Sequence, residues 1–201
     1  MKTTVALCPG KYSNFTGYVN CLGNEGYAEE ADFTIIPDYG IMSWRDGTWT
    51  GDMVHARWLG GVFKGGSFMG QWFGGEWRDG VWSQSIWHGG VWQNGLWKNG
   101  RWEGGEWNGG TWENGDWGKG LWRGGLWKAG LWLDGAWRGG DWLDGRWMRG
   151  DWFDGTWHNG TWLCGQWLGG KWLGGYIGDG MLVPRRWRKG RKPEKAKGVV
   201  K

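Results

Sequence analysis

The chain has 201 residues and a formal net charge of +4, and its composition is dominated by 45 glycines and 25 tryptophans. This length suits one domain with a continuous core. Scarce proline and a strict periodicity exclude a disordered low-complexity tract, and no stretch is long and apolar enough to span a membrane.

Residues 1–41 lack the periodicity of the rest of the chain. Short runs of aromatic and β-branched residues are broken by Pro9, Gly23 and Pro37. This pattern predicts a small β-rich cap, since stacked repeats need their open end covered. A docking segment for a partner is the alternative. The run Thr3–Leu7 is too short for the apolar part of a classical signal peptide, so synthesis in the cytoplasm is expected.

Residues 42–183 form a repeat in which tryptophan occupies every fifth position from Trp72 to Trp172. Glycine lies two residues before each of these tryptophans, except before Trp87, where Ser85 takes the place. Position two after tryptophan is mostly Gly, Asn or Asp, so each pentad G-x-W-x-x should contain a turn. Before Trp72 the repeat is irregular, with steps of four residues from Trp49 to Met53 and from Phe68 to Trp72.

The five-residue period excludes the common secondary structures. An amphipathic helix needs apolar spacings of three and four, and this glycine content would destabilise it. In long strands, tryptophans five apart would lie on opposite faces. Short strands separated by turns remain, arranged either as an antiparallel meander of tryptophan-paired hairpins or as a solenoid with parallel ladders between coils. A uniform meander would be out of hydrogen-bonding register unless alternate turns differed in type.

The solenoid layout resembles the pentapeptide-repeat family, whose units carry a small residue two positions before a central Leu or Phe, both pointing inward. Here Gly and Trp take those places. The resemblance implies an all-β repeat solenoid with four pentads to a square coil. The slots from Trp44 to Leu182 make twenty-nine pentads, which predicts about seven coils and a rod roughly 34 Å long. Indoles should then stack between coils, with each N–H bonded to a turn carbonyl.

A second, ten-residue period follows Trp132, with Asp-Gly pairs in alternate pentads, and square coils would place these pentads on opposite faces. In the same half, the outward position after tryptophan becomes apolar. Exposed apolar patches mark contacts, which predicts a surface for oligomerisation or for another protein, formed by Leu133, Leu143, Met148, Phe153, Leu163, Leu168 and Leu173.

The tail, residues 184–201, should be extended or flexible. Residues 183–201 carry a net charge of +8, which leaves −4 for residues 1–182. Basic clusters neutralise phosphates or acidic protein surfaces without a fold. The tail is therefore a candidate contact for nucleic acid or an acidic partner, through Arg185, Arg186, Trp187, Arg188, Lys189, Arg191, Lys192, Lys195, Lys197 and Lys201.

No catalytic constellation is expected, and no cofactor. His55, His88 and His158 lie far apart, and none has metal-ligand spacing to another His or to Cys. Cys8, Cys21 and Cys164 are an odd number without a CxxC pair, which indicates a reducing compartment. The carboxylates occupy outward repeat positions, where solvation explains them.

The leading functional hypothesis is a non-enzymatic scaffold, a rigid tryptophan-cored β-rod that assembles with other protein subunits or with itself. Its sequence is similar in style to Gly-aromatic repeat proteins of phage virions, which implies an accessory tail or capsid decoration component. Nucleic-acid association through the tail is one alternative. The G-x-W element is also similar to choline-binding repeats, which implies an adhesin that holds a carbohydrate or ammonium ligand on exposed tryptophan by cation–π contact.

Overall fold

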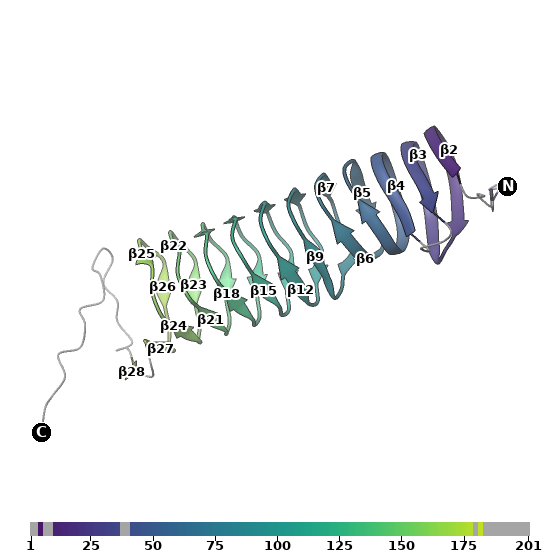
Figure 1. The fold of residues 1–201 in the computed structure, drawn as a ribbon. Coiled ribbons are helices and arrows are strands. Elements are labelled where there is room, and N and C mark those ends of the chain that lie inside the picture. Colours follow the sequence, from purple (N-terminus) through teal and green to yellow (C-terminus); the bar gives the residue numbers. More distant parts are fainter. Residues whose placement is uncertain (1–3, 6–9, 37–40, 179–180, 183–201) are drawn as a thin grey trace, which may run out of the picture.

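The computed structural model describes residues 4–5, 10–36, 41–178 and 181–182, and this part of the chain contains strands and turns and no helix. The strands stack into a rod, with the N-terminal strands at one end and the last short strands at the other (Figure 1). The predicted all-β repeat solenoid is confirmed. Between consecutive coils the ladders are parallel, which excludes the antiparallel meander.

The N-terminal end consists of long antiparallel strands. β2 (Gly10–Cys21) and β3 (Asn24–Ile36) form a hairpin whose turn residues, Leu22 and Gly23, both have positive φ. β3 pairs antiparallel with β4 (Ile41–Trp58), and β1 (Thr4–Val5) pairs parallel with the end of β2. β4 crosses the boundary expected after residue 41 without a break, so the division of the chain into three parts stays a prediction.

The repeat proper follows in parallel strands. β5 (Val62–Gly65) and β6 (Ser67–Trp72) pair with β4, and after them nearly every pentad forms a strand of two residues that ends on its tryptophan. These strands are β7 (Glu76–Trp77), β8 (Val81–Trp82), β9 (Ser85–Trp87), β10 (Val91–Trp92), β11 (Leu96–Trp97), β12 (Gly100–Trp102), β13 (Glu106–Trp107), β14 (Thr111–Trp112), β15 (Asp116–Trp117), β16 (Leu121–Trp122), β17 (Leu126–Trp127), β18 (Leu131–Trp132), β19 (Ala136–Trp137), β20 (Asp141–Trp142), β21 (Arg146–Trp147), β22 (Asp151–Trp152), β23 (Thr156–Trp157), β24 (Thr161–Trp162), β25 (Gln166–Trp167), β26 (Lys171–Trp172) and β27 (Tyr176–Ile177). The last short strand, β28 (Met181–Leu182), instead pairs antiparallel with β27.

Each coil has three sides, not the four expected from the family resemblance. Trp107 pairs with Trp92 and with Trp122, so the coil repeats after fifteen residues, or three pentads. We call the sides I (β9, β12, β15, β18, β21, β24, β27), II (β7, β10, β13, β16, β19, β22, β25) and III (β8, β11, β14, β17, β20, β23, β26). The rod has about 9 coils and a length of roughly 43 Å at strand spacing.

Two backbone hydrogen bonds per pentad join each coil to the one before. In the coil of Trp122, for example, Leu121 N donates to Gly105 O at 3.0 Å and Arg123 N donates to Trp107 O at 2.8 Å. The four-residue steps shorten single coils without breaking this ladder, since Trp58 pairs with Trp72 and Phe63 with Trp77, each fourteen residues on. The ladder therefore continues from the antiparallel end into the regular repeat.

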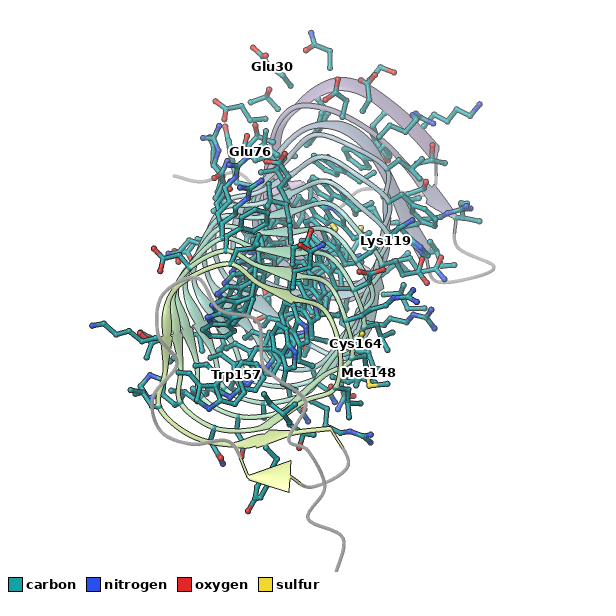
Figure 2. The ribbon with its side chains drawn as sticks, turned by 90° about the vertical axis from the view of Figure 1, so that its left-hand side faces the viewer. Glu30, Glu76, Lys119, Met148, Trp157 and Cys164 are labelled. Carbon is teal, nitrogen blue, oxygen red and sulfur yellow. The ribbon has the colours of Figure 1, made fainter. Side chains whose placement is uncertain are left out.

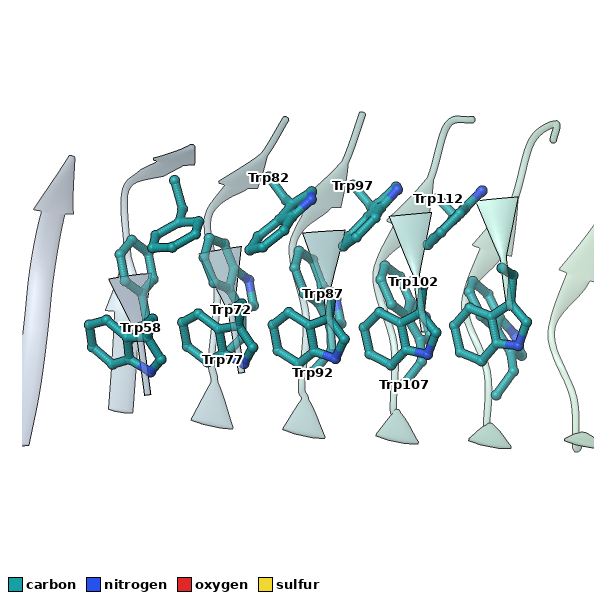
Figure 3. Packing of buried hydrophobic residues seen from close by; sticks show 14 of the residues in the cluster. Trp58, Trp72, Trp77, Trp82, Trp87, Trp92, Trp97, Trp102, Trp107 and Trp112 are labelled. Atoms are coloured by element: carbon teal, nitrogen blue, oxygen red, sulfur yellow. The ribbon is translucent and has the colours of Figure 1, made fainter. Parts of the chain in front are cut away.

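The core is made of indole rings in three columns, one behind each side (Figure 3). Trp107 stacks on Trp92 and Trp122 at centroid distances of 4.7 Å, with ring planes 6° apart. It meets Trp102 and Trp112 edge-on at 6.0 and 5.9 Å. Offset stacking and edge-to-face contact are the two favourable geometries for aromatic pairs. The prediction of inward, stacked tryptophans is confirmed.

The column of side I continues into the N-terminal strands. Trp58 stacks on Trp44 at 5.1 Å, Trp44 on Phe33 at 5.3 Å, and Phe33 on Tyr12 at 4.9 Å. All of these rings except Tyr12 are fully buried. The antiparallel strands β2 and β3 thus extend the same core to the end of the rod while reversing the direction of the chain.

The repeat glycines are required by the backbone. Gly125 has φ of +109°, and a Cβ there would overlap the carbonyl oxygen of Gly110 in the preceding coil. The resemblance implied that this small residue points inward and leaves room for the central side chain. In the structure the closest neighbour of the missing Cβ is instead the backbone one coil earlier, so glycine permits both the turn and the close stacking of coils.

Candidate functional site

The residues of the predicted apolar surface do not share one face. Leu133, Met148 and Leu163 follow the tryptophans of side I, Phe153 and Leu168 those of side II, and Leu143 and Leu173 those of side III. A coil of three pentads distributes these residues over all three sides. The same geometry places the three Asp-Gly pentads of the ten-residue period on three different sides, so opposite faces are not alike.

These seven residues instead surround the C-terminal part of the rod. We call them the apolar collar. In the last coil each side contributes one leucine, Leu163, Leu168 and Leu173, and the latter two are 50% and 49% exposed. Tyr176 beside them is 43% exposed. The equivalent positions nearer the N-terminus are mostly polar or charged, for example Arg78, Gln93 and Lys98. Whether the collar binds a partner stays a prediction.

Along the collar, Leu133, Met148 and Leu163 occupy equivalent positions in three successive coils of side I. Met148 and Cys164 project on the same side of the rod as Lys119, while Trp157 lies inside it (Figure 2). Arg149 follows Met148 in the sequence, and its Nε lies 3.0 Å from Asp134 Oδ2 in the adjacent coil. On side II, the guanidinium of Arg138 lies 3.8 Å from the centroid of the Phe153 ring. The Arg138 guanidinium thus partly covers the Phe153 ring.

Several charged side chains form ion pairs between neighbouring coils. Lys128 Nζ lies 3.1 Å from Glu113 Oε1, and Arg123 Nη2 lies 3.1 Å from Glu106 Oε2. These pairs are largely exposed, so each contributes little to stability.

His88 and His158 lie in such contacts between coils. His88 stacks on Phe73 at a centroid distance of 4.6 Å, and its Nδ1 lies 2.8 Å from Glu103 Oε2. His158 Nε2 lies 3.3 Å from Asp141 Oδ1. Within the described ranges no three of the His, Cys, Asp and Glu side chains converge as a metal site would require. Asp134, Asp144 and Asp154 each accept a hydrogen bond from the N–H of the glycine that follows.

A shallow, open groove of about 540 Å³ lies along the corner between sides II and III. Its floor consists of repeat glycines, including Gly80 and Gly95, and its walls of Val81, Leu96 and Thr111 on one side and Asp79 and Asn94 on the other. Asp79 already accepts the N–H of Gly80 at 2.8 Å. Lys64 also lines the groove, and its Nζ lies 3.0 Å from Glu29 Oε2.

Two groups near the N-terminal end have altered titration. The pKa of Tyr18 is raised, first because its hydroxyl donates a hydrogen bond to Glu25 Oε1 at 2.6 Å, and burial of the hydroxyl adds to this. Burial raises the pKa of the Cys21 thiol. Both residues belong to β2, far from the collar (Figure 1).

The basic tail, from Arg185 to Lys201, lies outside the described residues, and so does its predicted contact with nucleic acid. Among the residues that are described, no helix has the length and apolar character needed to cross a membrane. No family model, no curated protein and no solved structure matches this chain. The regular five-residue tryptophan ladder is consistent with a pentapeptide-repeat-like arrangement, and membership of that family remains a hypothesis.

Proposed function

We propose that the protein is a non-enzymatic scaffold, a rigid β-rod that assembles with other subunits through the apolar collar at its C-terminal end. An accessory role in a phage virion, in the tail or as a capsid decoration, would suit such a rod. A pentapeptide-repeat origin, with tryptophan in the central slot, is part of this proposal.

The observation that carries the proposal is the position of the exposed leucines. Leu168 and Leu173 are about half exposed on two sides of the last coil, next to the exposed Tyr176. Leucines lie there while the equivalent slots of the earlier coils hold Arg, Gln and Lys. Among the described residues these two leucines are the most exposed of the large apolar side chains, and exposed apolar surface favours contact with another protein.

The experiment measures molar mass by light scattering across a range of protein concentrations. We expect the unaltered chain to form a multimer and the double variant Leu168→Ser, Leu173→Ser to have a lower mass. The matched control is Gln93→Ser with Lys98→Ser, which changes the same slots on the same two sides of an earlier coil. A monomeric mass for the unaltered chain at every concentration, or equal masses for both variants, would contradict self-assembly through the collar.

The adhesin alternative requires tryptophan faces that a ligand can reach. Of the repeat tryptophans, those from Trp72 to Trp157 have 0% exposure, and only Trp167 is more than slightly accessible. This burial favours the scaffold over a tryptophan-based ligand site. Acrylamide quenching tests the choice: the scaffold predicts blue-shifted, poorly quenched emission, and the adhesin predicts ready quenching and a response to choline or sugars.

Nucleic-acid binding through the tail is a separate candidate, supported by the +8 charge of residues 183–201. Its affinity for duplex DNA should fall steeply with salt, because binding releases condensed counterions. Deleting residues 184–201 should abolish that binding. Salt-dependent binding that survives the deletion would place the contact on the body of the rod.

A further inference from the structure

The three indole columns form a continuous aromatic path through the rod. On side I, indoles stack without interruption from Trp44 to Trp162. The columns of sides II and III are continuous from Trp77 and Trp82 to the last coil, and Phe63 and Phe68 precede them. Side I is therefore the column in which indoles connect the last coils directly to the N-terminal strands.

The contacts within a column are close and parallel. In the middle of side I the centroid distances are 4.8 Å from Trp87 to Trp102 and from Trp102 to Trp117, with ring planes 6° and 7° apart. Indole is the most easily oxidised of the apolar side chains. When one ring has lost an electron, an identical neighbour in contact can supply one without any change in driving force. The edge-on contacts, such as Trp102 with Trp107 at 6.0 Å, connect the three columns to one another.

The surroundings of the indoles allow the positive charge of an oxidised ring to move from one coil to the next. A positive charge in a core costs free energy because water is absent, but this cost is similar in every interior coil. The indole faces on both sides also stabilise a cation between them. An indole radical cation becomes trapped when its N–H proton is lost to a base. The Nε1 atoms of Trp102, Trp117, Trp132 and Trp147 are buried and have no acceptor in the described part of the chain, so the proton stays on the ring.

We propose that the indole columns relay one-electron oxidation along the rod. A one-electron oxidant such as an oxygen-centred radical takes an electron from the partly exposed Trp167 and is reduced to its anion, which leaves an indole radical cation. Each stacked neighbour in turn gives one electron to the oxidised ring. Beyond Trp44 and Phe33 the next oxidisable ring is Tyr12, which gives up one electron and releases its phenolic proton to water. A soluble thiolate then reduces the phenoxyl radical, which takes up a proton, and the thiolate becomes a thiyl radical.

Cys164 allows a direct test, because it is exposed in the last coil. A ruthenium polypyridyl photo-oxidant is attached to it in the full-length chain carrying Cys8→Ser and Cys21→Ser, and a flash in the presence of an electron acceptor generates the oxidant. We expect an indole radical cation in the transient absorption, followed by a phenoxyl radical. The Tyr12→Phe variant should lose that phenoxyl signal and keep the indole signal.

The blocking variant replaces the tryptophans of two consecutive coils by phenylalanine, at Trp102, Trp107, Trp112, Trp117, Trp122 and Trp127. Phenylalanine is not oxidised under these conditions, and the chain already holds it in the same slots at Phe63 and Phe68. We expect the Tyr12 phenoxyl radical to be lost while indole radicals persist near Cys164. Because six substitutions could unfold the rod, circular dichroism checks the fold, and Trp44→Phe with Trp58→Phe interrupts the path near its end instead.

Two results would overturn the relay. The first is a Tyr12 phenoxyl radical of unchanged yield and rate in both interrupted variants, since the electron would then travel by another route. The second is the absence of that radical from the uninterrupted protein while indole radicals form near the label. Neither result bears on assembly through the collar, which is measured by molar mass.

Discussion

At the scale of single residues, glycine and tryptophan have different roles in the pentad: glycine permits the turn and tryptophan fills the core. Every repeat glycine from Gly90 to Gly175 has positive φ, a conformation that other residues adopt at a cost. Ser85 is the exception, and there Gln84 takes the positive φ of 54° while Ser85 Oγ accepts the N–H of Gly70 at 2.9 Å. The sequence predicted the glycine position correctly. It did not show that the reason is contact with the preceding backbone, because only the coil stacking reveals which atoms meet.

Adjacent glycines give a matched test of this reason. A Cβ on Gly125 would overlap Gly110 O at φ of +109°, whereas a Cβ on Gly124 would lie 3.8 Å from Asn108 O, an ordinary contact. We expect Gly125→Ala to destabilise the protein by about 1–3 kcal/mol or more through strain, and Gly124→Ala to be neutral or slightly stabilising. Thermal unfolding of the two variants measures the difference. Equal effects would mean that the turn tolerates a side chain at both positions.

The indole N–H groups were all expected to bond turn carbonyls, and the structure shows this for some of them. Trp122 Nε1 donates to Gly139 O at 3.1 Å, whereas Trp137 Nε1, one coil further on the same side, is buried without a partner in the described residues. Both rings are fully buried. Trp122→Phe should therefore cost about 0.5–1.5 kcal/mol more than Trp137→Phe, the value of a typical hydrogen bond. Denaturant unfolding compares the two, and equal losses would make the hydrogen bond energetically unimportant.

The thiols provide a prediction about pH. Burial disfavours the charged thiolate and raises the pKa of Cys21, so at mildly alkaline pH Cys21 should react more slowly with a disulfide reagent than the exposed Cys164. The neutral thiol is the form that the fold favours. The preference for the neutral Cys21 thiol therefore adds fully to the free energy of unfolding below the pKa of the unfolded thiol. This contribution is lost as pH rises through the higher pKa of the folded state. Reaction rates of single-cysteine variants across pH check this, and equal rates at every pH would contradict it.

At the scale of elements, periodicity predicted the strands but could not count the sides of a coil. Each pentad is one strand and one turn whatever the coil size, so the tryptophan pattern is the same for three sides and for four. The signal that distinguishes them lies in the outward residues: Glu113 with Lys128 and Asp134 with Arg149 are opposite charges fifteen residues apart. The four-sided family layout favoured a spacing of twenty, which gave about seven coils where the structure has about 9.

Engineered cross-links test the number of sides directly. Glu106 and Leu121 are partners in the parallel ladder of side II, and neighbouring strands lie about 4.8 Å apart, within the Cα range for a disulfide. In a chain whose three cysteines are replaced by serine, Glu106→Cys with Leu121→Cys should form an intramolecular disulfide on oxidation. Glu106→Cys with Leu126→Cys, which a four-sided coil would pair, should not. The reverse result, read by mass spectrometry, would restore the square coil.

At the scale of the whole molecule, the rod depends on its ends because each coil contacts only its neighbours. At the N-terminal end the outermost long strand is β2, and its pairing with β3 is irregular near Asn14, Phe15 and Gly17. Asn14 and Glu30 have positive φ at these irregularities. Such bulges bend an edge strand and prevent another chain from pairing with it. The sequence predicted a β-rich cap here, but the bulges depend on contacts that it does not display.

Removing this end should therefore change how the rod associates. Deleting residues 1–21 would expose the edge of β3, thirteen residues long, and the face of Phe33, on which Tyr12 stacks. An uncovered long edge is a template for strand pairing, so the truncated chain should gain mass with concentration by light scattering, beyond any assembly of the full chain. The deletion is made in the Leu168→Ser, Leu173→Ser variant, so that assembly through the collar does not mask the effect. If the truncated protein keeps its stacked-indole circular dichroism and its mass does not rise, β3 does not need its covering strand to remain soluble, and β2 contributes to the core alone.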